Sequence, residues 1–136
     1  MALLLDTCAA LWIVGGAPIS QAANAAMDDE HGSGKPISVS PITGWEIGLL
    51  AMRGRFTSPY SPRKWFDLLL GQDGIRLAPL SHTVLIDSSF LPAAPPRDPG
   101  DRIIIATARQ FDLTIVTRDR LILDYAEAGH VRAIAC

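Results

Sequence analysis

The stretch DPGDRIIIATARQFDLTIVTRD, residues 98–119, is where the secondary structure of the chain is easiest to predict. Asp98 followed by Pro99 is typical of a helix start, because aspartate caps free backbone N–H groups and proline suits the first helical turn. Isoleucine and alanine then recur at helical spacing, which predicts a helix over about Gly100–Gln110. The β-branched run Leu113–Thr117 predicts a strand directly after it. A helix that leads straight into a buried strand is the repeating unit of an α/β protein.

The same alternation extends outward from this stretch. Short apolar runs predict strands, and capped runs with helical periodicity predict helices. Further strands are expected at Ala2–Leu5, Ile37–Val39, Ile75–Leu77 and Val131–Ala135. Further helices are expected at Thr7–Val14, Ser20–Met27, Pro41–Arg53, Arg63–Leu70, His82–Phe90 and Arg120–Ala128, with a loop at Leu91–Pro96. This order predicts an α/β fold with a largely parallel central β-sheet flanked by helices on both faces.

Length and composition fit one globular domain over residues 1–136. Hydrophobic residues make up 49% of the chain and charged residues 19%, which is enough apolar surface for a core and too little charge for a disordered chain. Cys8 and Cys136 show neither a metal-ligand spacing nor the density of a disulfide-rich secreted protein. No apolar run approaches the roughly 20 residues of a membrane helix. We therefore expect a soluble, cytoplasmic protein with no membrane partner.

The formal net charge of -2 excludes an overall basic field of the kind that drives non-specific binding to nucleic acids. Any such contact must be local. Basic residues do occur in pairs, at Arg53 with Arg55, Arg63 with Lys64, Arg97 with Arg102, and Arg118 with Arg120. For any one pair, solvated surface charge is the simpler explanation.

Glu46 is the acidic residue whose position is hardest to explain by structure alone. It falls in the middle of the apolar stripe of its predicted helix, between Ile42 and Leu50. A carboxylate buried there without a partner costs free energy. We therefore expect a cation or a network of hydrogen-bond donors beside it.

Three further aspartates lie where strands end or helices begin. Asp6 ends the first predicted strand, Asp119 follows the strand before it by two residues, and Asp101 stands in the first turn of a helix whose dipole favours negative charge. Each has a purely structural explanation as a cap or dipole partner. For Asp98, directly before Pro99, capping is the better explanation.

Taken together, these acidic groups meet at one edge of a parallel sheet, where ligands of such sheets bind. Crowded carboxylates suit a hard cation such as Mg²⁺ or Mn²⁺. The three histidines, at positions 31, 82 and 130, have no mutual ligand spacing. Divalent cations held by carboxylates can activate water and stabilise the leaving oxygen of a phosphodiester, so the pattern favours a nuclease.

Four segments together resemble the PIN-domain ribonucleases of the VapC toxin family, and their order and spacing agree from end to end. The segments are Leu3–Thr7, Ser38–Ser40 leading to Trp45–Ile47, Arg97–Ala108, and Ile115–Asp119. The segment around Asp101 is the most specific. Many members carry an aromatic residue in place of Gly100 and a polar residue such as histidine in place of Cys8, which affects the loop shape and the lining of the site.

The resemblance implies a PIN-like fold and a Mg²⁺- or Mn²⁺-dependent endoribonuclease that cleaves structured RNA, such as transfer or ribosomal RNA, with water activated by metal. It also implies a cognate VapB-type antitoxin, a homodimer and a toxin–antitoxin hetero-oligomer. The implied catalytic and metal-binding residues are Asp6, Glu46, Asp101 and Asp119. Asp98 and Thr117 would support the site, and the candidates for RNA contacts are Arg53, Arg55, Arg102 and Arg118.

Other classes fit less well. A haloacid-dehalogenase-like phosphatase needs a second aspartate two residues after Asp6, where this chain has Cys8. A phosphoacceptor receiver domain needs a lysine after a late strand, and the lysines here are at positions 35 and 64. The serious alternative is a catalytically silent PIN fold that binds RNA or titrates an antitoxin. The presence of all four acidic residues favours an active enzyme.

Overall fold

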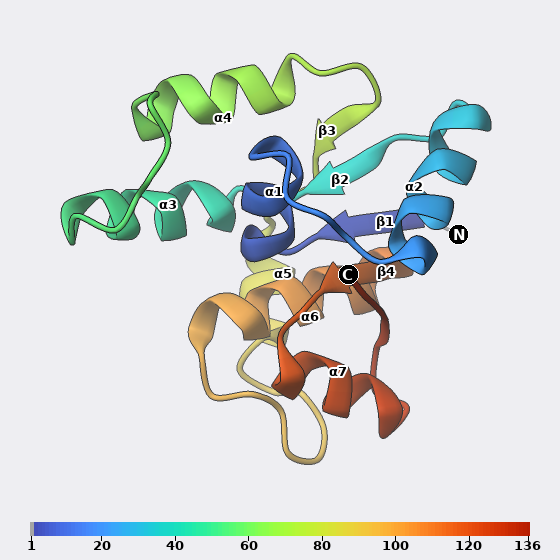
Figure 1. The fold of residues 1–136 in the computed structure, drawn as a ribbon. Helices are drawn as coiled ribbons and strands as arrows, with labels where there is room; N and C mark the ends of the chain where they lie inside the picture. Colours follow the sequence, from blue (N-terminus) through green and yellow to red (C-terminus); the bar gives the residue numbers. More distant parts are fainter. Residues whose placement is uncertain (1) are drawn as a thin grey trace.

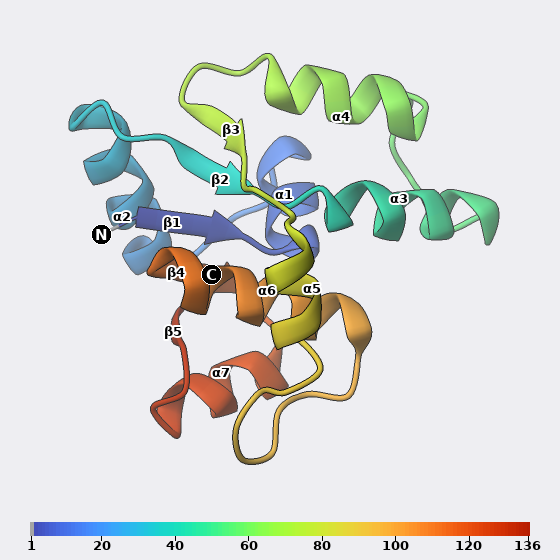
Figure 2. The ribbon, with the colours of Figure 1, turned by 180° about the vertical axis from the view of Figure 1, so that it is seen from behind.

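A computed structural model describes residues 2–136, which form a five-stranded parallel β-sheet with helices on both faces (Figures 1 and 2). The strands are β1 (Ala2–Leu5), β2 (Ile37–Val39), β3 (Ile75–Leu77), β4 (Leu113–Thr117) and β5 (Arg132–Ala135). The helices are α1 (Thr7–Val14), α2 (Gln21–Gly32), α3 (Ile42–Met52), α4 (Pro62–Leu70), α5 (His82–Asp87), α6 (Pro99–Phe111) and α7 (Arg120–Glu127). The predicted α/β fold class is confirmed, and every strand pair is parallel.

The sheet separates two apolar cores, because successive side chains of a strand point to opposite faces. Leu3 and Leu5 of β1 pack on the side covered by α1, α2 and α4. Leu4 packs on the other side, against Ile104 and Ile105 of α6. All three leucines are fully or almost fully buried. Burial on both faces explains why these strands read as continuous apolar runs.

The strand order β3-β2-β1-β4-β5 places β1 in the centre of the sheet. Leu5 of β1 lies opposite Val39 of β2 on one side and Val116 of β4 on the other. The carboxyl ends of these three strands therefore reach the same edge. In Figures 1 and 2, α1 starts at this edge and α3 and α4 extend beyond it.

Two helices end several residues away from their predicted ends, and the bounds of the others agree to within one residue. Helix α2 continues to Gly32, five residues beyond the predicted end at Met27, because the polar segment after Met27 keeps the helical repeat and places Glu30 on the same buried face as Ala23 and Ala26. Helix α5 ends at Asp87 rather than at Phe90. In the part of the chain that the structure describes, no helix is long and apolar enough to cross a membrane.

Candidate active site

Asp6 lies at the carboxyl end of β1 and caps α1. Its Oδ1 atom accepts a hydrogen bond from the backbone N–H of Ala9 at 2.7 Å, and its Oδ2 atom accepts one from the hydroxyl of Thr117. The same hydroxyl accepts a hydrogen bond from the backbone N–H of Asp119 at 2.9 Å. Thr117 thus holds the end of β1 and the start of α7 together. Burial raises the pKa of Asp6, these two hydrogen bonds oppose the rise, and the charge of Asp119 adds to it.

Glu46 projects from the middle of α3 towards α1. Its Oε1 atom accepts a hydrogen bond from the hydroxyl of Thr7 at 2.7 Å, and the Thr43 hydroxyl lies 2.9 Å from that of Thr7. The expected network of donors beside Glu46 is therefore present. Burial raises the pKa of Glu46, the hydrogen bond from Thr7 opposes this, and the charges of Asp98 and Asp6 raise the pKa further.

The start of α6 lies so close to Glu46 that a side chain at position 100 would displace the Glu46 carboxylate from its present place. A Cβ atom added to Gly100 would lie 2.9 Å from Cδ of Glu46, 3.0 Å from its Oε2 and 3.1 Å from Oδ1 of Asp98. Asp98 caps α6 by accepting a hydrogen bond from the backbone N–H of Asp101 at 3.0 Å. The absence of a side chain at position 100 thus creates the space that the Glu46 carboxylate occupies.

Asp101 is the most perturbed aspartate of this edge. Its pKa is raised from 3.8 to about 7, first by burial and then by the surrounding negative charges of Asp119, Asp98, Glu46 and Asp6, in that order. Asp119 is the N-cap of α7, because its Oδ1 atom accepts hydrogen bonds from the backbone N–H groups of Leu121 and Ile122 at 2.8 and 3.2 Å. Four elements therefore bring carboxylates into mutual electrostatic range.

Cys8 is a further neighbour of this cluster, in line with the expectation that position 8 affects the lining of the site. It lies in the first turn of α1, and its pKa is raised to about 11, first by burial and then by Asp6, Glu46, Asp101 and Asp119. The charges of all four carboxylates thus act on this one thiol. The available signal was its position two residues after Asp6, which places it beside the helix start.

The donor chemistry of the cluster fits a hard divalent cation, because every candidate ligand is a carboxylate oxygen. Within residues 2–136, none of the four forms an ion pair with lysine or arginine. As the side chains stand, no three acidic, histidine or cysteine groups of these residues are arranged to hold an ion at once. Capping of α1 and α7 occupies one oxygen each of Asp6 and Asp119.

The four arginines proposed for RNA contacts fall into two groups. Arg102 and Arg118 donate hydrogen bonds to backbone carbonyls, Arg102 to Ser88 at 3.0 Å and Arg118 to Cys136 at 2.7 Å. Their side chains therefore stabilise the fold. Arg53 and Arg55, just after α3, are exposed and form no ion pair in residues 2–136.

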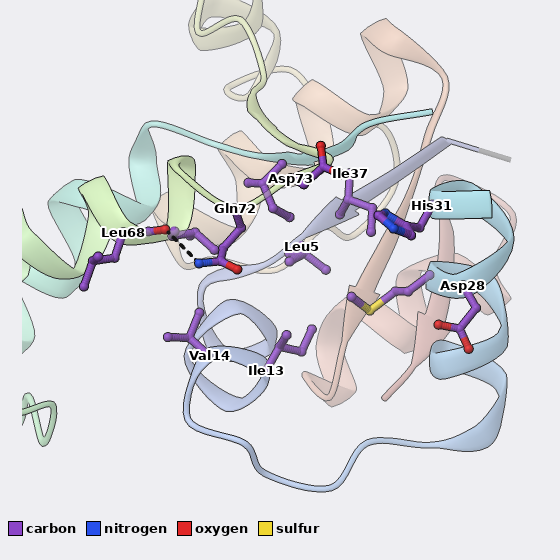
Figure 3. A pocket seen from close by; sticks show the side chains of 12 residues that line it. Leu5, Ile13, Val14, Asp28, His31, Ile37, Leu68, Gln72 and Asp73 are labelled. Carbon is purple, nitrogen blue, oxygen red and sulfur yellow. Dashed lines mark hydrogen bonds between the residues drawn. The ribbon is translucent and has the colours of Figure 1, made fainter. Parts of the chain in front are cut away.

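A cavity of about 450 Å³ lies on the sheet face covered by α1, α2 and α4 (Figure 3). Its wall is mostly apolar and includes Leu5, Ile13 and Ile37, with His31 and Asp28 from α2. Leu5, which lines the cavity, directly precedes Asp6 in the sequence. None of the four clustered carboxylates lines the cavity, however. It is therefore not part of the candidate active site.

Comparison with known proteins gives one consistent family. The PIN domain model matches residues 3–128. Ribonuclease VapC22 from Mycobacterium tuberculosis is 30% identical over 118 residues, which is 86% of each protein. Among solved structures, VapBC2 from Rickettsia felis bound to a promoter DNA fragment superposes with a TM-score of 0.66 at 12% identity, over 99% of this chain and 98% of that one. A toxin–antitoxin complex from Klebsiella pneumoniae gives a TM-score of 0.58 at 19% identity, over 98% and 96%.

Proposed function

Since this chain belongs to the PIN-domain family, within which it is similar to VapC ribonucleases, we propose that it is a Mg²⁺- or Mn²⁺-dependent endoribonuclease that acts as the toxin of a toxin–antitoxin pair. The observation that carries the proposal is the set of hydrogen bonds and helix caps that bring Asp6, Glu46, Asp101 and Asp119 to one edge of the sheet. These carboxylates come from different elements, their burial and mutual charge raise the pKa of Asp101 to about 7, and none of them is ion-paired with lysine or arginine within the described residues 2–136. Perturbed carboxylates of this kind gather at functional sites.

In this proposal Asp6, Glu46, Asp101 and Asp119 hold the cation. A divalent cation at such a site lowers the pKa of an attacking water molecule and neutralises charge on the phosphodiester. The chain's own residues set the geometry. Thr117 fixes the Asp6 carboxylate, and Thr7 fixes that of Glu46. The caps of α1 and α7 place Asp6 and Asp119 at adjacent strand ends.

The proposal predicts that RNA cleavage depends on the metal. The purified chain should cleave a structured RNA, such as transfer or ribosomal RNA, when Mg²⁺ or Mn²⁺ is added, and EDTA should stop the reaction. Gel analysis of RNA after incubation with each ion measures this. Undiminished cleavage in EDTA would contradict the metal assignment. Binding of RNA without cleavage under any ion would favour the catalytically silent alternative.

The approach of Gly100 to Glu46 gives a second prediction. Gly100→Ala should lower kcat/KM by about 10- to 100-fold, because the new Cβ would displace the Glu46 carboxylate and small misplacements of catalytic groups have effects of this size. The melting temperature should change little, because the atoms that must move end a flexible side chain.

Gly48→Ala is the matched control, since Gly48 lies on the same helix as Glu46 and an added Cβ would meet nothing within 4 Å. Alanine is the better helix former by about 0.5–1 kcal/mol, so this variant should keep its activity and melt slightly higher. Equal activity of both variants would show that the Gly100 contact does not position Glu46.

We also propose a VapB-type antitoxin as protein partner, together with a homodimer and a toxin–antitoxin hetero-oligomer. The proposal is supported by the fold that the chain shares with the VapBC2 and Klebsiella pneumoniae complexes. Co-expression with the product of a neighbouring reading frame and measurement of the mass of the complex tests it. A chain that stays alone when co-expressed would contradict it.

A further inference from the structure

A pocket with aromatic walls lies one helical turn away from the clustered carboxylates. It has a volume of about 640 Å³, and we call it the aromatic pocket; the residues that define it are Trp12, Leu50, Arg55, Phe56, Tyr60 and Trp65. Leu50 follows Glu46 by four residues on α3, and Trp12 follows Cys8 by four residues on α1. Residues four apart lie on the same helix face, about 6 Å apart along the axis. The pocket therefore adjoins the site along both helices.

The aromatic rings of the pocket differ in burial, because some are packed against one another and Tyr60 is exposed. Trp65 is 3% exposed and meets Phe56 edge-on, with ring centroids 6.2 Å apart. Tyr60 is 49% exposed and makes no ring contact with another aromatic residue of the described chain. Its ring is therefore available for stacking. Trp12 carries the Arg118 guanidinium 4.1 Å from its ring centroid, which adds positive charge beside the pocket.

Charge distinguishes this pocket from the others. None of its lining residues is acidic, and Arg55 lines it, whereas each of four other surface cavities of similar size includes at least one aspartate. The surrounding segment, residues 47–66, contains three arginines, one lysine and no acidic residue. An aromatic surface with basic residues around it is what proteins use to bind single-stranded nucleic acid. A purely apolar partner segment would not require the charge.

We propose that the aromatic pocket binds an unpaired base of the RNA strand, next to the phosphate group that lies at the clustered carboxylates. Tyr60 stacks on this base, and Arg55 pairs with a backbone phosphate. The proposal rests on the ribonuclease function proposed above and adds a position at which the substrate must be unpaired. Thr57 and Ser58 also line the pocket, and their hydroxyl groups can bond the edge of the base. The substrate class is therefore RNA with a flexible or looped nucleotide next to the cleaved bond.

The test is binding of short fluorescein-labelled single-stranded RNA, measured by fluorescence anisotropy in EDTA so that the probe is not consumed. Tyr60→Ala should weaken binding by about 10-fold, the usual effect of losing one stacked base, and Tyr60→Phe should bind like the parent. Phe90→Ala is the control, because Phe90 is an aromatic residue that is 80% exposed and lies outside the pocket. Arg55→Gln should lower the slope of log affinity against log salt by about 0.7, the share of one phosphate on a single strand.

A probe with one abasic nucleotide, placed in turn at each position, completes the test. At one position the missing base should weaken binding to the parent by about 10-fold and make no further difference to Tyr60→Ala. Equal affinities of Tyr60→Ala and Phe90→Ala would overturn the proposal, as would absence of RNA binding by the parent. Cleavage with no effect of Tyr60→Ala on affinity would leave the ribonuclease function standing and remove the pocket from it. Binding that depends on Tyr60, without cleavage in Mg²⁺ or Mn²⁺, would support the pocket as an RNA-binding site and contradict the ribonuclease function.

Discussion

Asp101→Asn should reduce RNA cleavage by about 10³-fold or more, while Asp98→Asn should reduce it by no more than a few-fold. A cation at the active site contributes several kcal/mol to stabilising the transition state, and each 1.36 kcal/mol corresponds to a factor of ten in rate. Asparagine at position 101 keeps the size of the side chain but loses the charge that binds the cation. Single-turnover cleavage of the same RNA by both variants measures the difference.

Asp98→Asn is the matched control because the two residues lie three positions apart at the same helix start. Asp98 accepts a hydrogen bond from the backbone N–H of Asp101, and asparagine caps helices about as well as aspartate. The variant should therefore keep α6 in place. If Asp98→Asn were as inactive as Asp101→Asn, the two aspartates would share the same role and Asp98 would have to be counted among the cation ligands.

Asp6→Asn and Glu46→Gln should show losses similar to that of Asp101→Asn, because each carboxylate belongs to the same cluster. Asp119→Asn separates two roles in one residue. Its backbone cap of α7 survives in asparagine, so a loss of activity without a loss of stability would assign Asp119 to the cation.

Much of the fold followed from local sequence. The predicted strand Leu113–Thr117 matches β4, and the predicted helix before it matches α6 to within one residue at each end, because Asp98 and Pro99 mark its start unambiguously. The end of α2 was missed because a polar run such as residues 28–32 satisfies both a loop and a solvated helix. Only burial of Glu30 against the rest of the fold decides between them.

Prediction of the site was limited in a different way. Glu46 was identifiable because a carboxylate in an apolar stripe has no local explanation. The contact of Gly100 with Glu46 joins residues far apart in sequence. Cys8 is a near neighbour of Asp6 in the sequence, but only the fold brings its thiol close to the other carboxylates. The aromatic pocket likewise draws on residues 11–17 and 50–65, which only the folded chain brings together. Arg118 was expected to contact RNA, but its side chain donates a hydrogen bond to the backbone carbonyl of Cys136.

Without metal, the cluster should destabilise the fold at neutral pH, and removing one charge should raise the melting temperature. The pKa of Asp101 is about 7 in the folded chain, against a value near 3.9 for an unfolded aspartate. A raised folded-state pKa means that the folded state binds the proton more tightly. The associated stability is therefore fully present below about pH 4 and is lost as the pH rises through about 7.

Asp101→Asn should consequently melt higher than the parent at pH 7.5 in EDTA. The shift of the pKa corresponds to about 4 kcal/mol, but Asp101 is only half-buried and solvent screening reduces this to roughly 1–2 kcal/mol. For a chain of this length that is roughly 3–10 °C. At pH 5 the difference should shrink, because Asp101 of the parent is then protonated and resembles asparagine.

Added metal should act in the opposite direction, by stabilising the parent more than it stabilises Asp101→Asn. A cation that binds only the folded state stabilises it by about 2.7 kcal/mol at 100 times its dissociation constant, and a site that has lost a ligand binds more weakly. Millimolar Mg²⁺ should therefore raise the melting temperature of the parent more than that of Asp101→Asn. Asp67→Asn removes an exposed charge on α4 and serves as a control. Neither its free energy of unfolding in EDTA nor its stabilisation by Mg²⁺ should differ from that of the parent by more than the roughly 0.5 kcal/mol typical of surface substitutions. If Asp101→Asn instead melts below the parent in EDTA and keeps the full Mg²⁺ shift, Asp101 acts only through the helix dipole of α6, and the cation must be held by the other three carboxylates.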